Sequence, residues 1–496
     1  MNNNSVRKQH IAVSAGLNII RKGCMIAFPL ITYAYATRVL GTEAIGVYEF
    51  SQSIVNYFAL IAALGITQYA VRDGAQYLKR DNQSEEMSKF ASEVFSINLI
   101  MTFISYGIMT ALVLSNSLLS SYKSVIFIYS ASILFTTLGV DWINSLYEDY
   151  LYLTVRYIVV SVISIGLLFI FVKSPADVNK YTAISIFAIV VNGLLNYIYI
   201  QKYVKVRFTF NVNILKHGLP IFILFCNNIA SVIYLNSDVT ILRILTDDRN
   251  VGLYGVAAKI YMMIKELMNA AIFVTIPRFS MYVSSKEDSD NLDKYVQGVR
   301  NLLSPLLTVL VPSCIGLGFL SKGVIKIVAG NDFVEGAIGL RILAPAMFFA
   351  VMACFLAYAI IMPHKLEKYF LVATSIAAGS NIVLNLILIP IIGMPAAAIT
   401  TLFAEIMVFT MLGMIASKCI DFKRIIDSKD VVAIVVGGFV VAVVCMLKAN
   451  IVSDSNSMLT TIITVVIAAI SYLIIQYLMK NSTIIYVKEL ISKRKK

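Results

Sequence analysis

Long apolar segments alternate with short polar connections along almost the entire chain. About fourteen of these segments can cross a hydrocarbon layer ~30 Å thick, which takes roughly 20 mostly apolar residues in a helix. The pattern therefore predicts an all-α polytopic membrane protein. The predicted helices cover residues 10–36, 46–70, 91–114, 122–141, 152–172, 181–201, 218–242, 252–276, 301–320, 340–362, 369–391, 395–416, 431–447 and 457–479.

Composition supports this interpretation. Of the 496 residues, 59% are hydrophobic and only 14% are charged, which lies outside the range of soluble globular domains. The longest hydrophilic connections, residues 71–90 and 277–300, are too short for a soluble domain. The first segment is longer than a signal-peptide core and has no small-residue cleavage site, so we predict a retained helix.

Residue types that carry enzyme chemistry form no recognisable motif. The six cysteines and three histidines have no metal-ligand spacing, and no nucleophile or phosphate-loop motif is present. We therefore expect a protein that is not an enzyme and that needs neither a metal nor another cofactor. The one tryptophan, Trp142, directly follows the fourth predicted helix at its cytoplasmic end, where an interfacial anchor is expected.

Basic residues are distributed unequally between the two sides of the membrane. The side that holds both termini carries 27 of the 41 lysines and arginines, and the other side carries 10. The positive-inside rule therefore predicts that both termini are cytoplasmic. The net charge of +13 follows from these loops and the tail ISKRKK, so we expect anionic membrane lipids as partners and no nucleic acid.

Four basic residues remain, and they lie inside predicted helices. They are Arg21 and Lys22 in the first helix, and Lys259 and Lys265 in the eighth. Each costs ~2.5 to 3.5 kcal/mol at mid-bilayer, so such side chains face a cavity or a partner. At ~100° per residue, Arg21 and Lys22 flank Asn18 on one wedge of the helix. The first helix contains no acid, so we expect its cations to bind an anion.

Carboxylates within other helices offer an alternative explanation. The candidates are Glu49, Asp238, Glu266 and Glu405, and Glu266 directly follows Lys265 in the sequence. These acids could neutralise the intramembrane cations by charge pairing, or they could couple transport to protons or sodium. The sequence leaves both roles open.

The second half of the chain resembles the first. IGVYEFSQ from Ile45 aligns with VGLYGVAA from Val251 at an offset of 206, and the same offset relates Arg72 to Arg278. Chance similarity between two apolar stretches is the alternative. A parallel repeat of six helices is typical of transporters, which bind substrate between the lobes. We accordingly predict lobes at 1–210 and 211–420, followed by a helix pair and basic tail at 421–496.

Four stretches of sequence resemble a known family. They are TRVLGTEAIGVYEFSQSIVNYFALIAALGITQYAVRD from Thr37, DWINSLYEDYLYLTVR from Asp141, VAGNDFVEGAIGLRILAPAM from Val328, and NIVLNLILIPIIGMPAAAITTLFAE from Asn381. Together they are similar to the oligosaccharide flippases of the polysaccharide transporter family. That family belongs to the superfamily of multidrug, oligosaccharidyl-lipid and polysaccharide flippases.

The resemblance implies a function and a site. Members move undecaprenyl-pyrophosphate-linked sugar repeat units from the inner to the outer leaflet of the bacterial cytoplasmic membrane, for surface polysaccharides such as lipopolysaccharide, and polymerase machinery is a candidate partner. Related lipid II flippases have a cationic cavity with arginines on helices 1 and 8. Arg21, Lys22, Lys259 and Lys265 would be the counterparts here, with Asn18 as a polar cavity residue. Lysine on helix 8 departs from that pattern.

Three other functions compete with this one. Cation-coupled multidrug export on the same fold predicts acids in the lobe cavities, especially on the first helix, which here carries cations. A membrane glycosyltransferase or polymerase would need a larger catalytic segment than these loops provide. A non-transporting scaffold for polysaccharide assembly has no support in the loops.

Overall fold

The computed structural model describes residues 11–78, 83–147, 149–284, 289–451, 458–485 and 488. Side chains at some helical positions, residues 11–22 among them, lie outside this description. All regular elements in the described part are helical. The chain forms two compact units, Met1–Thr240 and Ile241–Lys496, and each is described by itself.

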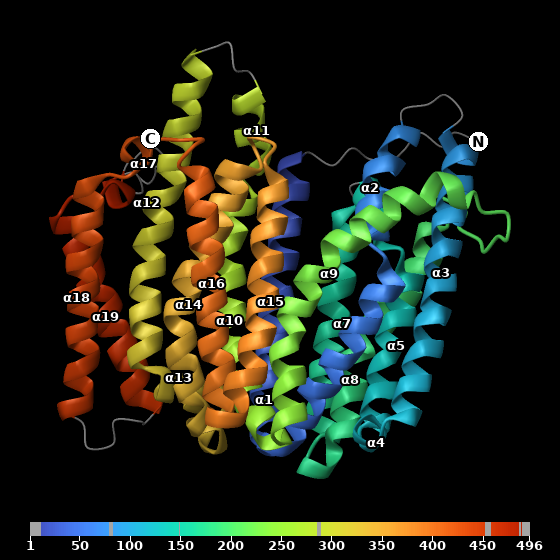
Figure 1. Cartoon of the computed structure of the whole chain (residues 1–496), viewed down its shortest axis with the longest axis horizontal. Coiled ribbons are helices and arrows are strands. Elements are labelled where there is room, and N and C mark those ends of the chain that lie inside the picture. Colours follow the sequence, from blue (N-terminus) through green and yellow to red (C-terminus); the bar gives the residue numbers. More distant parts are fainter. Residues whose placement is uncertain are drawn as a thin grey trace. The chain divides into compact units, whose positions relative to one another are not determined.

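The first unit is built from long helices joined by short turns (Figure 1). Its last helix, α9, extends slightly beyond the unit, and it bends by 43° between the segments Lys216–Ala230 and Val232–Leu245. The elements are α1 (Ile11–Ala63), α2 (Ile66–Tyr77), α3 (Gln83–Ser115), α4 (Ser117–Ser121), α5 (Lys123–Gly139), α6 (Asp141–Leu146), α7 (Tyr150–Phe171), η1 (Pro175–Asp177), α8 (Val178–Ile200) and α9 (Ile214–Leu245).

The second unit is also helical, and it contains a C-terminal helix pair, α18 and α19, which packs beside α12 and α13. Its elements are α10 (Asp248–Phe273), α11 (Ile276–Ser284), α12 (Ser289–Phe319), α13 (Ser321–Ala329), η2 (Asn331–Gly336), α14 (Ala337–Phe355), η3 (Leu356–Ile361), α15 (Glu367–Ile392), α16 (Met394–Ala416), α17 (Phe422–Ile425), α18 (Ser428–Ile451) and α19 (Met458–Leu478).

The described residues contain 11 helices that are long and apolar enough to cross a membrane, and the bent α9 brings the number to 12. Three of the predicted spans are counted differently in the structure. The first two run together as α1, which a kink at Gly41 divides, and the fourth is the shorter apolar helix Lys123–Gly139. The structure confirms the predicted all-α polytopic membrane protein. The predicted number of about fourteen membrane-spanning helices is approximate.

Glycine permits both sharp features at the start of the first unit. Gly41 has a φ of 77°, in the left-handed region that side chains with a Cβ rarely adopt, and it turns the chain within α1. Gly65 has a φ of 73° and separates α1 from α2. A Cβ on Gly65 would lie 2.8 Å from Cβ of Leu224, so the missing side chain lets this turn approach α9 closely.

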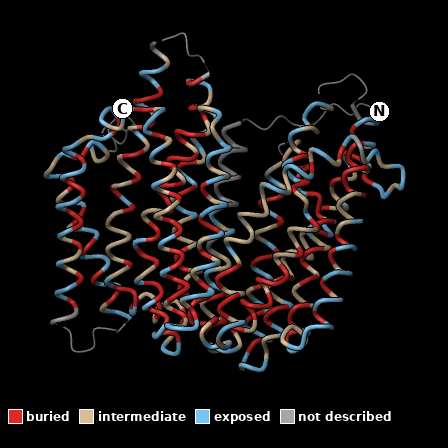
Figure 2. The backbone as a smooth tube through the Cα atoms, in the orientation of Figure 1, coloured by how far each residue is buried: buried red, intermediate tan, exposed pale blue. Residues whose placement is uncertain are grey.

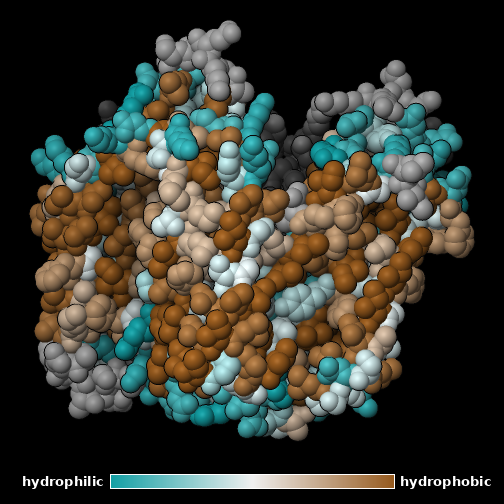
Figure 3. Space-filling view, viewed as in Figure 1, coloured by the Kyte–Doolittle hydropathy of each residue, from teal (hydrophilic) through white to brown (hydrophobic). Residues whose placement is uncertain are grey.

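On the face that Figure 3 shows, apolar side chains cover much of each unit, as expected for a protein that has lipid as its solvent. Large exposed examples are Phe103, Ile198 and Phe439. Buried residues lie where the helices of a unit face one another (Figure 2). Trp142 is one of them, with 5% of its surface exposed and an edge contact to Phe90, so the interfacial role predicted for it is wrong.

Most of the helix α9 belongs to the first unit. The predicted lobes divide the chain at residue 210, whereas the compact units divide at Thr240. Hydrogen bonds join α9 to α1, α2 and α3 in this unit.

Candidate functional site

The predicted cations of the first helix lie in α1, before its kink at Gly41. The backbone at Asn18, Arg21 and Lys22 is helical, as expected. Their side chains lie outside the described part of the structure, so the predicted anion site on this helix stays a prediction.

On α10, one predicted cation has a carboxylate partner. Nζ of Lys265 lies 3.7 Å from Oε1 of Glu405 on α16, and the Tyr261 hydroxyl donates a 2.9 Å hydrogen bond to the same oxygen. The Lys265 and Glu405 side chains are only 12% and 8% exposed. Nζ also lies 4.9 Å from the centre of the Tyr261 ring. Pairing places a nearly neutral group, rather than an isolated cation, within the helical unit.

The other charged residues of α10 have different surroundings. Lys259 is half-buried, and Glu266 is exposed. Glu266 lies close enough to Cys354 on α14 to interact with it electrostatically, as do Lys265 and Glu405. The structure thus brings Lys265, Glu405 and Glu266 into one region of the second unit.

In the first unit, Glu49 is a buried acid surrounded by tyrosines. It lies on α1 with 8% of its surface exposed, and its Oε1 has no hydrogen-bond partner among the described residues. Tyr33, Tyr129 and Tyr181 are close enough to interact with it electrostatically. Among the described residues no ion pair to Glu49 is formed, and a carboxylate in such a shell is suited to bind a proton or a small cation.

A row of polar contacts joins the second half of α9 to α1. The Asn56 side-chain amide donates to Oδ1 of Asn236 at 2.9 Å. The Thr240 hydroxyl lies 3.1 Å from the hydroxyls of both Ser53 and Tyr57. Asp238, another predicted site residue, is buried on this part of α9.

A buried histidine joins the first half of α9 to α2 and α3 through hydrogen bonds. His217 is fully buried, its Nε2 lies 2.6 Å from Oε2 of Glu93 on α3, and its Nδ1 lies 2.6 Å from the Tyr69 hydroxyl on α2. Sequence reasoning missed this triad because the three residues are scattered along the chain. The only signal available was an acid, Glu93, in the predicted third helix.

A fully buried polar cluster also joins α15 and α16. Nδ2 of Asn385 donates to Oδ1 of Asn381 at 3.1 Å, and the Thr400 hydroxyl donates to Oδ1 of Asn385 at 2.7 Å. Within a membrane, buried polar groups must form hydrogen bonds with one another, and these side chains do so between two neighbouring helices.

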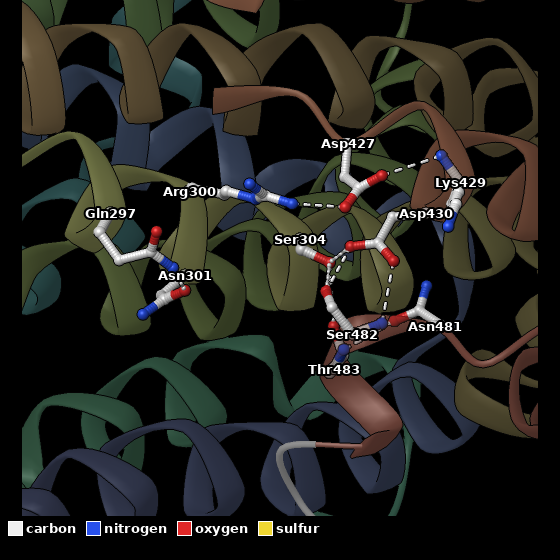
Figure 4. Close-up of polar contacts among 10 residues, drawn as sticks. All are labelled: Gln297, Arg300, Asn301, Ser304, Asp427, Lys429, Asp430, Asn481, Ser482 and Thr483. Atoms are coloured by element: carbon white, nitrogen blue, oxygen red, sulfur yellow. Dashed lines mark hydrogen bonds and ion pairs between the residues drawn. The ribbon is translucent and has the colours of Figure 1, made fainter. Parts of the chain in front are cut away.

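The third polar cluster holds the C-terminal pair to α12 (Figure 4). Oδ2 of Asp430 accepts from the Ser304 hydroxyl at 2.6 Å, and Oδ1 accepts from the Ser482 backbone amide at 2.9 Å. Arg300 pairs with Asp427 just before α18, and these residues line a small pocket with Ser304 and Asp430. The bonds link α12, the start of α18 and the segment after α19, so we interpret this cluster as structural.

None of these clusters is a metal centre. The described residues contain no group of three or more histidine, cysteine, aspartate or glutamate side chains placed to hold a metal ion.

The long apolar helices, with polar side chains that bond one another between them, define a multi-pass membrane protein. Two solved structures share the fold. The lipid II flippase MurJ in an inward closed conformation matches with a TM-score of 0.72 and 18% identity, covering 97% of this chain and 100% of that chain. An inward-facing multidrug resistance MATE family transporter of the MOP superfamily matches with a TM-score of 0.57 and 13% identity, covering 81% and 98%.

The family follows from the sequence match. The chain belongs to the family described as polysaccharide biosynthesis protein, whose model matches residues 13–283. A protein of Escherichia coli (strain K12) that is inferred to be an O-antigen transporter is 24% identical over 419 residues, which cover 83% of this chain and 93% of that protein. These findings confirm the resemblance drawn from the sequence, and these relatives are transport proteins rather than enzymes.

Proposed function

We propose that this protein is a flippase that moves undecaprenyl-pyrophosphate-linked oligosaccharide repeat units from the inner to the outer leaflet of the bacterial cytoplasmic membrane. The observation that carries the proposal is family membership combined with a flippase fold that extends over nearly the whole chain. The relative inferred to transport O-antigen supports a lipid-linked glycan for surface polysaccharide as the substrate class. The charge distribution supports cytoplasmic termini.

The pyrophosphate is the part of this substrate that cations can recognise. We assign it to Arg21 and Lys22 on α1, since arginine binds phosphate with two donors and lysine supplies a point charge. Lys259 and Lys265 on α10 assist. Because Glu405 already pairs with Lys265, the arriving pyrophosphate competes with this carboxylate for the lysine. For the charge to balance, the displaced Glu405 carboxylate must take up a proton or a cation.

Alternating access of the two units then exposes the glycan to the opposite side, while the polyprenyl chain remains in lipid. Moving about two negative charges outward against an inside-negative potential releases ~2.3 kcal/mol per charge per 100 mV, so roughly 4 to 5 kcal/mol is available. The alternative energy source is proton or sodium coupling through Glu49, Asp238 or Glu405. Of Glu49 and Asp238 in the first unit, Glu49 is better placed to bind a coupling ion, because its Oε1 lacks a hydrogen-bond partner among the described residues.

A reconstituted transfer assay tests the function. Proteoliposomes containing the wild-type protein and an undecaprenyl-pyrophosphate oligosaccharide are given a defined membrane potential, and the glycan that reaches the opposite leaflet is measured. The proposal predicts protein-dependent transfer that increases when the destination side is positive. Efflux of a cationic drug without lipid transfer would instead establish the multidrug exporter.

A second arm separates the energy sources. Glu49→Gln, Asp238→Asn and Glu405→Gln are each assayed with and without a pH or sodium gradient. Loss of gradient dependence in one variant identifies the coupling acid, whereas dependence on potential alone removes ion coupling from the mechanism.

A further inference from the structure

The connection between α8 and α9 is an extended segment that lies along α3. In Figure 1 it belongs to the green loop that projects sideways beside α3. We call residues 204–210, with the sequence VKVRFTF, the strap. Its chemistry alternates strictly: positions 204, 206, 208 and 210 are apolar, and positions 205, 207 and 209 are basic or polar.

Backbone amides of the strap bind a row of serines on α3. The amide of Lys205 donates to Ser88 at 3.3 Å, that of Arg207 to Ser92 at 3.1 Å, and that of Thr209 to Ser96 at 2.8 Å. The spacing of the bonded amides along the strap matches the spacing of the serines along α3. Four residues of extended chain advance ~13 Å, and eight residues of helix advance ~12 Å. The strap is therefore held straight along α3, in the direction in which that helix enters the membrane.

The apolar positions of the strap leave the protein core as the segment advances. Val204 and Val206 are 2% and 1% exposed, whereas Phe208 and Phe210 are 41% and 91% exposed. The two phenylalanine rings contact each other edge to face, with centroids 4.8 Å apart. Thus the same face of the strap that fills the core at one end presents an uncovered aromatic pair at the other.

The height of this pair along α3 indicates what covers it. Thr209 is bound to Ser96, and one helical turn further, ~6 Å along the axis, the lipid-facing surface of α3 begins at Ile100 and Phe103. The phenylalanines thus lie at the edge of the hydrocarbon layer. Aromatic side chains at this level are stabilised by partition into the interface between headgroups and acyl chains.

The basic positions of the strap face away from the core. Lys205 and Arg207 are exposed, and neither side chain forms an ion pair among the described residues. The neighbouring Lys202 differs, because its Nζ lies 3.4 Å from the Tyr199 ring centre and 3.9 Å from Oδ2 of Asp149. Two available cations beside an exposed aromatic pair match an anionic lipid surface in both charge and polarity.

We propose that the strap is a membrane anchor that inserts Phe208 and Phe210 at the acyl boundary and binds acidic phospholipid headgroups through Lys205 and Arg207. The anchor is independent of the glycolipid that the protein moves. It fixes the connection that leads into α9 to the membrane surface, because His217 follows the strap by seven residues and is bonded to the same helix, α3, through Glu93.

Insertion of the strap is tested with Phe210→Trp, a conservative change at an exposed site. The protein is reconstituted with phosphatidylcholine brominated near the headgroup end of the acyl chain, and wild type, whose one tryptophan Trp142 is buried, gives the background. The proposal predicts that the added emission is blue-shifted and quenched. Emission typical of water without quenching would overturn it.

Lipid selectivity is tested by titrating phosphatidylglycerol into the detergent-solubilised Phe210→Trp protein. Adding Lys205→Gln and Arg207→Gln should weaken the apparent affinity by roughly fivefold per charge. The matched control is Lys123→Gln with Lys173→Gln. It removes two exposed cations of the same unit, one at the start of α5 and one just after α7, and should leave the affinity unchanged. Equal effects of both pairs would overturn the proposal, as would a response to a polyprenyl pyrophosphate with none to phosphatidylglycerol.

Discussion

Nζ of Lys265 and the Tyr261 hydroxyl converge on one oxygen, Oε1 of Glu405, at 3.7 Å and 2.9 Å. Two consequences follow from this relationship. The lysine is held neutralised inside an apolar helical unit, and in the proposed function the pyrophosphate displaces the carboxylate to bind this lysine. The pairing therefore predicts how substitutions at Lys265 and Glu405 change the stability of the protein.

Removing either partner of this pair leaves the other charge buried and uncompensated. We expect Lys265→Met and Glu405→Gln each to reduce the stability of the protein by about 3 to 5 kcal/mol, and the double variant to recover most of the loss. Thermal unfolding in detergent measures the effect. The exposed pair Arg249 and Glu335 provides the control, because Glu335→Gln should cost less than about 1 kcal/mol. Single variants as stable as wild type would contradict this interpretation.

His217 should be the histidine that matters most for stability. His217→Ala leaves the Glu93 carboxylate and the Tyr69 hydroxyl without their buried partner, so we expect a loss of about 3 kcal/mol or more. The control is His364→Ala, because this partly buried ring has a hydrogen bond to the Ile360 carbonyl of its own segment. Hydrogen exchange in the first half of α9 should increase only in His217→Ala. Unchanged exchange would show that the triad does not hold this helix.

The turn at Gly65 should not tolerate a side chain. Gly65→Ala requires a left-handed backbone and brings a Cβ to 2.8 Å from Leu224, so we expect a cost of about 2 to 4 kcal/mol. Gly107→Ala in α3 meets no atom within 4 Å and should be neutral or stabilising by about 0.5 to 1 kcal/mol. Parallel thermal unfolding of the two variants measures the difference, and equal unfolding temperatures would refute the close approach.

Asp430 should hold the segment after α19 against α12. Asp430→Asn weakens its acceptance of hydrogen bonds from Ser304 and Ser482, so amide exchange at residues 482–485 should accelerate. Asp293→Asn, which removes a carboxylate bonded to Arg424 at an exposed site, serves as the control. Equal exchange at residues 482–485 in both variants would contradict the structural role of Asp430.

The sequence predicts the helical architecture because lipid imposes a length and an apolarity on each span that can be read locally. It also locates the division between the first two helices, where Gly41 separates the legs of α1. Trp142 shows the limit of local reasoning. Its position at a helix end suggests an interface, but packing against Phe90 buries it.

Pairings between distant residues could not be read from the sequence. Glu266 is adjacent to Lys265 along the chain, yet successive residues on a helix point in different directions, and the partner in the structure is Glu405, 140 residues away. His217 and Glu93 are 124 residues apart and lie in segments with no shared pattern. Such contacts arise from helix packing, which a single sequence does not specify. The strap likewise depends on the match between an extended chain and the serine row of α3.

Arg21 and Lys22 are the residues that we propose bind the pyrophosphate of a transported glycolipid. The most direct test compares wild type with Arg21→Ala/Lys22→Ala, at matched amounts of folded protein, for transfer of undecaprenyl-pyrophosphate oligosaccharide between leaflets of proteoliposomes. We expect transfer by wild type and its loss in the double variant. Equal transfer by both proteins would contradict the assignment of the pyrophosphate to these two residues, and no transfer by folded wild type under an applied potential would contradict the flippase itself.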